Sequence, residues 1–188
     1  MAYWSPRLST VILGLGIGVG LILSGCEVAE VEGTVSESKS LPIRLVDEAA
    51  PLGDQPEQPL FTVVGSPEEW DALEGSLPAQ AIAAGMRASA DLENLVLVVF
   101  AGQKPSSGFR IAVEGIYPQD DVYLVRVEET LPGPEQITEP AVTLPYQVIA
   151  ISRNEFPEAA DITFVFQDTQ NKELARTTIN SEAPYPVP

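Results

Sequence analysis

The sequence predicts an α+β domain dominated by β-structure, namely an antiparallel sheet or sandwich with one or two short helices packed on it. Leu95 to Phe100 is apolar at every position, as in a strand that is covered on both faces. The segments that follow alternate apolar and polar side chains, which is typical of strands with one buried face. A helix-start signal stands upstream of these strands, at Ser66 to Glu69.

The first 25 residues have the parts of a secretory signal. Arg7 supplies a positive charge, and an apolar run of 13 residues extends from Val11 to Leu23. As a helix this run would reach about 20 Å, at 1.5 Å per residue. A bilayer core needs roughly 30 Å, so a permanent membrane span is disfavoured.

The end of this segment, Leu23-Ser24-Gly25-Cys26, resembles the bacterial lipobox. The resemblance implies cleavage before Cys26 and attachment of diacylglycerol to its thiol, so that the membrane is a partner through this lipid. An ordinary signal peptide with a chance cysteine is the alternative. We expect a protein exported from the cytoplasm and lipid-anchored to a bacterial membrane, on its periplasmic or extracytoplasmic face. Cys26 is the only cysteine in the chain, which fits a residue kept for one purpose.

Residues 26–59 are predicted to form a tether. The segment is acidic and contains four prolines, and such a composition buries little apolar surface. Within it, Leu41 to Val46 has the apolar character of a strand that adds to the edge of the domain.

Residues 60–182 are predicted to form a single globular domain. After a strand at Leu60 to Val64, Ser66 suits a helix N-cap, with Pro67 at the first helical position and Glu69 completing a capping box. Trp70 shares a helix face with two leucines, which indicates a core residue. Residues 79–91 are alanine-rich and are compatible with a second short helix or a long loop.

The remaining strands follow from alternation and from apolar runs. They are expected at residues 109–113, 123–127, 142–151, 162–166 and 173–179. Pro145 has no N–H group to donate, so it is expected at a sheet edge or a bulge. Residues 183–188 form a Pro-rich tail.

The middle of the chain, residues 95–153, resembles the PrcB C-terminal domain family. The resemblance rests on four motifs in the following order: Leu97-Val98-Val99-Phe100, the turn Gly102-Gln103-Lys104-Pro105-Ser106-Ser107-Gly108-Phe109, two alternating strands around Ile111 and Val125, and Leu144-Pro145-Tyr146-Gln147-Val148-Ile149. Ser107 stands where the family prefers glycine, and Phe109 where tyrosine is common. The family is named for a subunit of a surface protease complex, so the resemblance implies membership of a complex and no catalytic residues.

Composition excludes several classes of function. The chain has 27 acidic and 10 basic residues, the wrong charge balance for binding nucleic acid. It has no histidine, which removes Ser-His-Asp catalysis and the usual zinc sites. We expect no enzyme activity, no cofactor and no metal site.

One loop is a candidate for recognition. Gly102, Pro105 and Gly108 shape a rigid turn that presents Lys104, Ser106 and Ser107. Recognition groups often lie on loops that a rigid scaffold supports. The alternative is a hairpin connection whose residues are chosen for backbone geometry alone.

The function that these observations favour is a membrane-tethered, non-enzymatic accessory or binding subunit of an envelope complex, associated with a protease. We expect a protein partner whose identity the residues do not give. A small-ligand or carbohydrate-binding lipoprotein is the second hypothesis, and a hydrolase that uses carboxylates alone is the third. An exposed apolar patch favours the first, a deep pocket with Tyr or Trp the second, and converging carboxylates the third.

Overall fold

The computed structural model of the chain describes residues 39–90, 93–157 and 161–179. The chain divides into two units, residues 1–35 and 36–188, and all described residues belong to the second. The expected signal segment, Cys26 and the tail 183–188 lie outside the described residues. Among the described residues no helix is long and apolar enough to cross a membrane.

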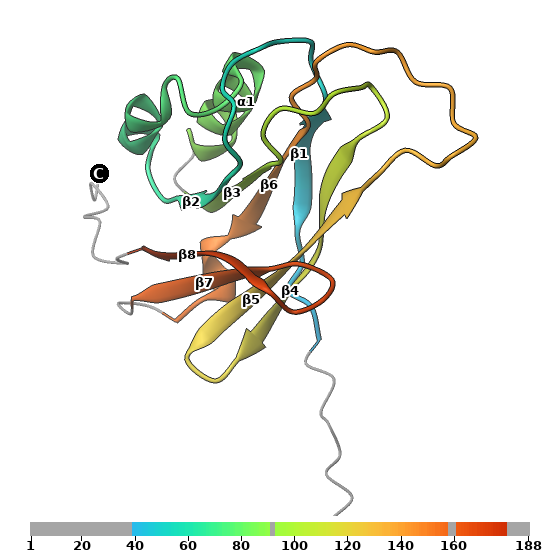
Figure 1. The fold of residues 1–188 in the computed structure, drawn as a ribbon. Helices are drawn as coiled ribbons and strands as arrows, with labels where there is room; N and C mark the ends of the chain where they lie inside the picture. Colours follow the sequence, from blue (N-terminus) through green and yellow to red (C-terminus); the bar gives the residue numbers. More distant parts are fainter. Residues whose placement is uncertain (1–38, 91–92, 158–160, 180–188) are drawn as a thin grey trace, which may run out of the picture. The chain divides into compact units, whose positions relative to one another are not determined.

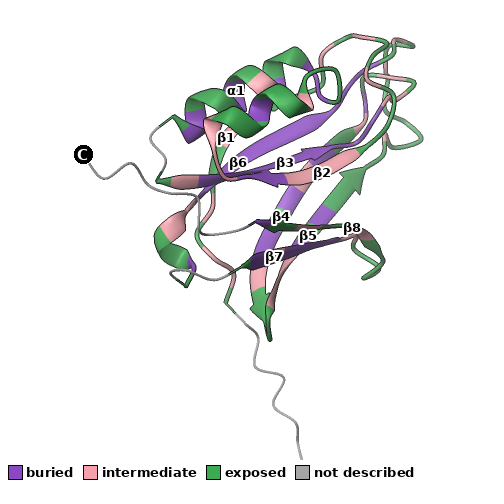
Figure 2. Ribbon diagram, turned by 90° about the vertical axis from the view of Figure 1, so that its left-hand side faces the viewer, coloured by how far each residue is buried: buried purple, intermediate pink, exposed green. Residues whose placement is uncertain are grey.

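Two four-stranded sheets face each other, and the two longer helices cover the outer face of the first sheet (Figures 1 and 2). The first sheet has the order β1 (Arg44–Ala49), β6 (Tyr146–Ser152), β3 (Asn94–Phe100) and β2 (Leu60–Val64). The second has the order β4 (Arg110–Gln119), β5 (Val122–Thr130), β7 (Ile162–Gln167) and β8 (Glu173–Ile179). The helices are η1 (Pro67–Leu73), α1 (Ala79–Ser89) and η2 (Arg153–Glu155). The expected α+β, β-dominated sandwich is confirmed.

The central pair of the first sheet, β3 and β6, separates two apolar clusters. Leu95, Leu97 and Val99 of β3 point into the layer between the sheets. Val96 and Val98, one position along, point to the helices instead. This alternation is the period-2 pattern of a strand, and it explains why the run 95–100 is apolar at every position.

The helical layer is fixed by one tryptophan. Trp70 is fully buried, and its indole N–H donates to Ser89 Oγ at 2.9 Å. Gly85 of α1 lies against the face of the ring, because a Cβ at this position would overlap the ring carbons. The sequence-based assignment of Trp70 to the core is therefore confirmed.

The start of η1 differs in detail from the expected capping box. η1 begins at Pro67 as predicted, but it is a 3-10 helix and the Ser66 side chain makes no capping hydrogen bond. Instead, Glu69 Oε2 accepts a hydrogen bond from the Gly65 N–H at 2.8 Å. Glu69 therefore still bonds the backbone at the helix start, but at Gly65 instead of at Ser66.

Three strand predictions need correction. The edge strand of the first sheet runs from Arg44 to Ala49, later than the expected Leu41 to Val46. β6 begins at Tyr146, so Pro145 precedes the strand and contributes only its carbonyl, which accepts from the Ala101 N–H at 3.0 Å. β7 pairs parallel with β5, because the chain crosses to the first sheet through β6 before it returns.

The folded domain also begins earlier than residue 60, inside the predicted tether. β1 pairs with β6 along its length. Leu41 donates its N–H to the carbonyl of Ile116 at 2.8 Å, and Gly53 donates to that of Val142 at 3.2 Å. Backbone pairing of this segment holds it to the domain despite an acidic, Pro-containing composition.

The packing of Trp70 on Gly85 leads to a prediction that opposes helix propensity. Trp70→Ala should lower the free energy of unfolding by about 3–5 kcal/mol, as for other buried aromatic residues. Gly85→Ala should also destabilise, by about 1–3 kcal/mol, because the new methyl group overlaps the ring. Alanine is otherwise favoured over glycine in a helix by roughly 1 kcal/mol.

A double-mutant cycle measured by urea unfolding separates the two effects. In the Trp70→Ala background the ring is absent, so Gly85→Ala should become neutral or stabilising. If Gly85→Ala destabilised both backgrounds equally, the ring contact would not be the cause.

Candidate functional site at the loop end

Three loops meet at one end of the sandwich, which we call the loop end: residues 50–59, 101–109 and 131–145. Strand register brings them together, because Phe100 at the end of β3 pairs with Tyr146 at the start of β6. The loop after β3 and the loop before β6 therefore leave the sheet side by side (Figure 1).

Thr143 is the centre of the contacts between these loops. Its N–H and carbonyl both pair with the backbone of Lys104 at 2.9 Å. On its other side it forms an antiparallel bridge with Leu52. Its hydroxyl donates to the carbonyl of Ser106 at 2.9 Å. Thr143 is buried, so these bonds satisfy polar groups that water does not reach.

The residues proposed for recognition all take part in this arrangement. Lys104 Nζ lies 2.6 Å from Glu129 Oε1 and 5.8 Å from the centre of the Phe109 ring. The Lys104 side chain is only 17% exposed. Ser107 exchanges two hydrogen bonds with Glu139, through its N–H and its hydroxyl. A recognition role for Lys104, Ser106 and Ser107 stays a prediction, and their bonds support the hairpin geometry as well.

The two glycines of the Gly-x-x-Pro-x-x-Gly turn, Gly102 and Gly108, let neighbouring segments approach the turn closely. Gly102 has φ +75°, a conformation that favours glycine, and its backbone lies against Glu57 and Pro59. At Gly108 a Cβ would lie 2.5 Å from Pro132 Cβ and 2.6 Å from Thr138 Cγ2. The second glycine is therefore the point where the loop 131–145 closes onto the turn.

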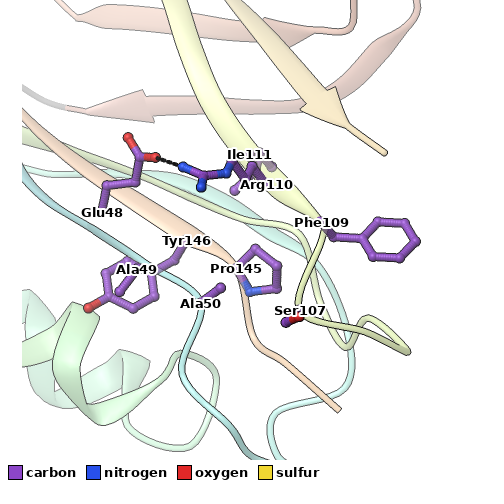
Figure 3. A pocket seen from close by; sticks show the side chains of 9 residues that line it. All are labelled: Glu48, Ala49, Ala50, Ser107, Phe109, Arg110, Ile111, Pro145 and Tyr146. Atoms are coloured by element: carbon purple, nitrogen blue, oxygen red, sulfur yellow. Dashed lines mark ion pairs between the residues drawn. The ribbon is translucent and has the colours of Figure 1, made fainter. Parts of the chain in front are cut away.

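A pocket of about 240 Å³ opens between the end of β1 and the start of β4 (Figure 3). Its lining includes Glu48, Ala50, Phe109, Ile111 and Pro145. The Glu48 carboxylate faces the Arg110 guanidinium at 3.8 Å across the pocket. The Arg110 side chain is 75% exposed, so this pair contributes little to stability.

The side chain of Gln147 bridges the two sheets. Its side-chain oxygen accepts a hydrogen bond from the Val113 N–H at 2.8 Å, and its side-chain nitrogen donates to Glu48 at 3.0 Å. The residue is buried, so both of its polar groups need these partners. One side chain thereby links β6 to β4 and to β1.

Tyr146 anchors β1 from the helical side of the sheet. Its hydroxyl donates to Asp47 Oδ2 at 2.8 Å, while the ring is buried. Burial, followed by the hydrogen bond and charge of Asp47, raises the pKa of the Tyr146 hydroxyl above its ordinary value. The aromatic residue of the Pro145-Tyr146 motif thus holds the edge strand against β6.

The pocket has few features of a sugar site or a hydrolytic site. Figure 3 shows the Phe109 ring directed away from the Glu48–Arg110 pair and the Tyr146 hydroxyl turned to the opposite side. Pockets for small ligands are commonly about 300–1,000 Å³. Glu48 is the only carboxylate in the lining. In the described part of the chain no group of three or more His, Cys, Asp or Glu side chains is placed to hold a metal ion.

Exposed apolar side chains concentrate at the loop end. Among the described residues six large hydrophobic side chains are exposed, and four of them lie on these loops: Leu52, Leu131, Ile137 and Val142. Ile137 is fully exposed and Leu131 is 66% exposed. Apolar side chains gathered on one part of a surface are a feature of sites that bind other proteins.

Comparison with protein families gives one finding that bears on this end of the molecule. The family model described as PrcB C-terminal matches residues 95–152. The chain carries a PrcB C-terminal-like domain. The resemblance identified over residues 95–153 is therefore confirmed within one residue of its end.

The PrcB-like segment contains β3, β4, β5 and β6 together with the loops 101–109 and 131–145. It therefore supplies most of the loop end, whereas β1 and residues 50–59 come from outside the match. No curated protein and no solved structure matches the chain.

The segments that pack on the Gly102–Gly108 turn could not be predicted from the sequence. Leu131-Pro132-Gly133-Pro134 has the local pattern of a break between strands, although it begins the loop that packs on Gly108. Glu129, the ion partner of Lys104, carries no local signal of this contact. No local pattern in the sequence signals contacts between segments about thirty residues apart.

The contact at Gly108 predicts the effect of a methyl group placed between the loops 101–109 and 131–145. Gly108→Ala should lower the free energy of unfolding by about 1–3 kcal/mol, because the methyl group collides with Pro132 and Thr138. Hydrogen exchange of residues 131–142 should become faster. Gly133→Ala is the matched control, since a Cβ there meets nothing within 4 Å. Equal behaviour of the two variants would contradict the proposed contact.

The raised pKa of Tyr146 predicts a stability loss at alkaline pH. The folded-state pKa lies above the unfolded value near 10, so the neutral hydroxyl stabilises the fold fully below about pH 10. This contribution is lost as pH rises further. Urea unfolding of Tyr146→Phe should show a lower stability at pH 7 and a shallower decline between pH 9 and 11. A decline as steep as that of the wild type would rule out Tyr146 as its source.

Proposed function

We propose that this protein is a membrane-tethered, non-enzymatic accessory subunit of a bacterial envelope complex, associated with a protease. In this proposal the chain is exported, cleaved before Cys26 and anchored by lipid on that cysteine. The domain of residues 40–179 then binds a partner protein through its loop end.

The match of residues 95–152 to the PrcB C-terminal family is the observation that carries the proposal. The family is named for a protease-complex subunit, so the match suggests an associated role for this chain. The matched segment coincides with the strands and loops that build the loop end.

The surface chemistry of the loop end supports a protein partner. Its four exposed apolar side chains favour contact with another protein over free solvent. The bonds of Thr143 and Ser107 hold the loops in place before binding. A preformed surface loses less conformational entropy when it binds.

The point at which the described chain begins is compatible with this use of the surface. The described chain begins at the opposite end of the sandwich from the loops 101–109 and 131–145 (Figure 1). Residues 27–38 separate Cys26 from the domain, and an extended chain of this length spans up to roughly 40 Å. An anchor attached there leaves the loop end accessible.

The lipid anchor and the partner are tested together in cells that produce the full chain. Cys26→Ala should abolish incorporation of labelled fatty acid and release the protein from the membrane fraction or leave it as the uncleaved precursor. Wild-type chain isolated from membranes after chemical cross-linking should bring one stoichiometric protein partner, with a protease in the same complex.

Ser38→Ala is the matched control, because it changes a residue near the anchor without changing the thiol. It should behave as the wild type in both labelling and fractionation. Labelled Cys26→Ala protein would contradict the anchor. Wild-type chain that cross-links to no protein would contradict the accessory-subunit proposal.

A further inference from the structure

The outer edge of β4 is paired at one place by the chain itself. Residues 40 and 41, just before β1, lie beside β4 at Ile116. The Ile116 N–H donates to Ser40 Oγ at 3.2 Å, and the Ile116 carbonyl accepts from the Leu41 N–H at 2.8 Å. β1 then turns away from β4 and pairs with β6.

Further along the outer edge of β4, the side chain of Gln147 bonds the backbone where a neighbouring strand would otherwise pair. The Val113 N–H points away from β5, because it donates to Gln147 Oε1. In an antiparallel ladder the residues whose N–H and C=O groups point outward alternate with those that bond the neighbouring strand. Val113 pairs with Val127 and Ile111 with Glu129, so Ile111 is the next outward-facing position.

The backbone of Ile111 lies on the outer edge of the second sheet, because β4 is its edge strand and, among the described strands, pairs only with β5. The loop and side-chain hydrogen bonds that cap this edge are made at Ile116 and Val113. Ile111 is only 3% exposed, yet it lines the pocket between β1 and β4. The outward N–H and C=O groups of an edge strand can pair with an added strand, and the pocket gives a partner access to those of Ile111.

We propose that an extended segment of a partner protein adds to the edge of β4 at Ile111, with one side chain in the pocket. The inference rests on the proposed function, since it names how the partner subunit binds. One residue of an added strand supplies both an acceptor for the Ile111 N–H and a donor for its carbonyl. It would lie beyond Val113, on the part of the β4 edge that Ser40, Leu41 and Gln147 do not cover.

The pocket indicates the side chains of that segment. Ala50 and Pro145 offer small apolar walls, and a volume of about 240 Å³ holds one side chain of moderate size. The Glu48 carboxylate lies 3.8 Å from the Arg110 guanidinium, which is long for an ion pair, so it can also pair with a cation of the partner. An apolar residue next to a lysine or arginine therefore fits this edge best.

Other occupants fit less well. The described chain ends at Ile179, which pairs with Ile162 next to the β4–β5 hairpin, at the far end of β4 from Arg110. Residues 180–188 contain three prolines, which have no N–H group to donate to a strand. A second copy would bring together two chains of net charge −17, which repel each other.

A photo-cross-linking amino acid at Ala50, in the full chain inside producing cells, tests the surface. Ala83 on α1 and Asp121 at the far end of β4 are control positions, and both are exposed. Ile137 is a third position, on the loop end but away from the pocket lining. We expect an adduct with another protein at Ala50 and none at Ala83 or Asp121.

The outcomes separate this inference from the proposed function. A protein adduct at Ile137, Ala83 or Asp121 without one at Ala50 overturns strand addition and leaves the accessory-subunit proposal standing. Adducts with a second copy, or with lipid alone, at Ala50 also overturn strand addition. No protein adduct at any position overturns both.

A synthetic peptide of the segment cross-linked at Ala50 then tests the pairing itself. Adding it to the full chain should slow hydrogen exchange of the Ile111 amide at least tenfold, with little change at Val113, whose N–H is already bonded. Ala50→Trp, which fills the pocket, should weaken peptide binding more than tenfold, whereas Ala83→Trp should not. Binding with unchanged exchange at Ile111 would show that the peptide does not join β4.

Discussion

The fold depends on the pairing of β3 with β6 at the centre of the first sheet. Both strands are buried on two faces, so alternate side chains must be apolar in both directions. A slip of one residue would exchange the two clusters, moving Leu97 to the helices and Val98 to the second sheet. Register is thereby fixed strongly, and the other strands and helices assemble around this pair.

The same register builds the loop end. Because Phe100 faces Tyr146, the turn after β3 and the loop before β6 run side by side, and Thr143 can pair with Lys104. Gln147, the second residue of β6, then reaches across to Val113, and the edge of β4 continues beyond it. The site proposed for a partner is therefore a consequence of how the core is aligned.

Much of this fold could be predicted from local pattern. The two-faced run at Leu95, the helix start at Pro67 and the core role of Trp70 each depend on neighbouring residues. The parallel pairing of β5 with β7 and the attachment of residues 40–59 depend on distant backbone hydrogen bonds, which composition does not encode. The loop at Lys104 was found, but its ion pair with Glu129 was not, since that contact exists only once β4 and β5 are paired.

Native-state hydrogen exchange of the full chain tests the role of the β3–β6 pair most directly. If this pair organises the domain, the amides of Val98 and Ile149 should exchange only through global unfolding. Their opening free energy should then equal the free energy of unfolding measured with urea. Exchange of these amides through a smaller opening, while the β4–β5 hairpin remains protected, would contradict the account.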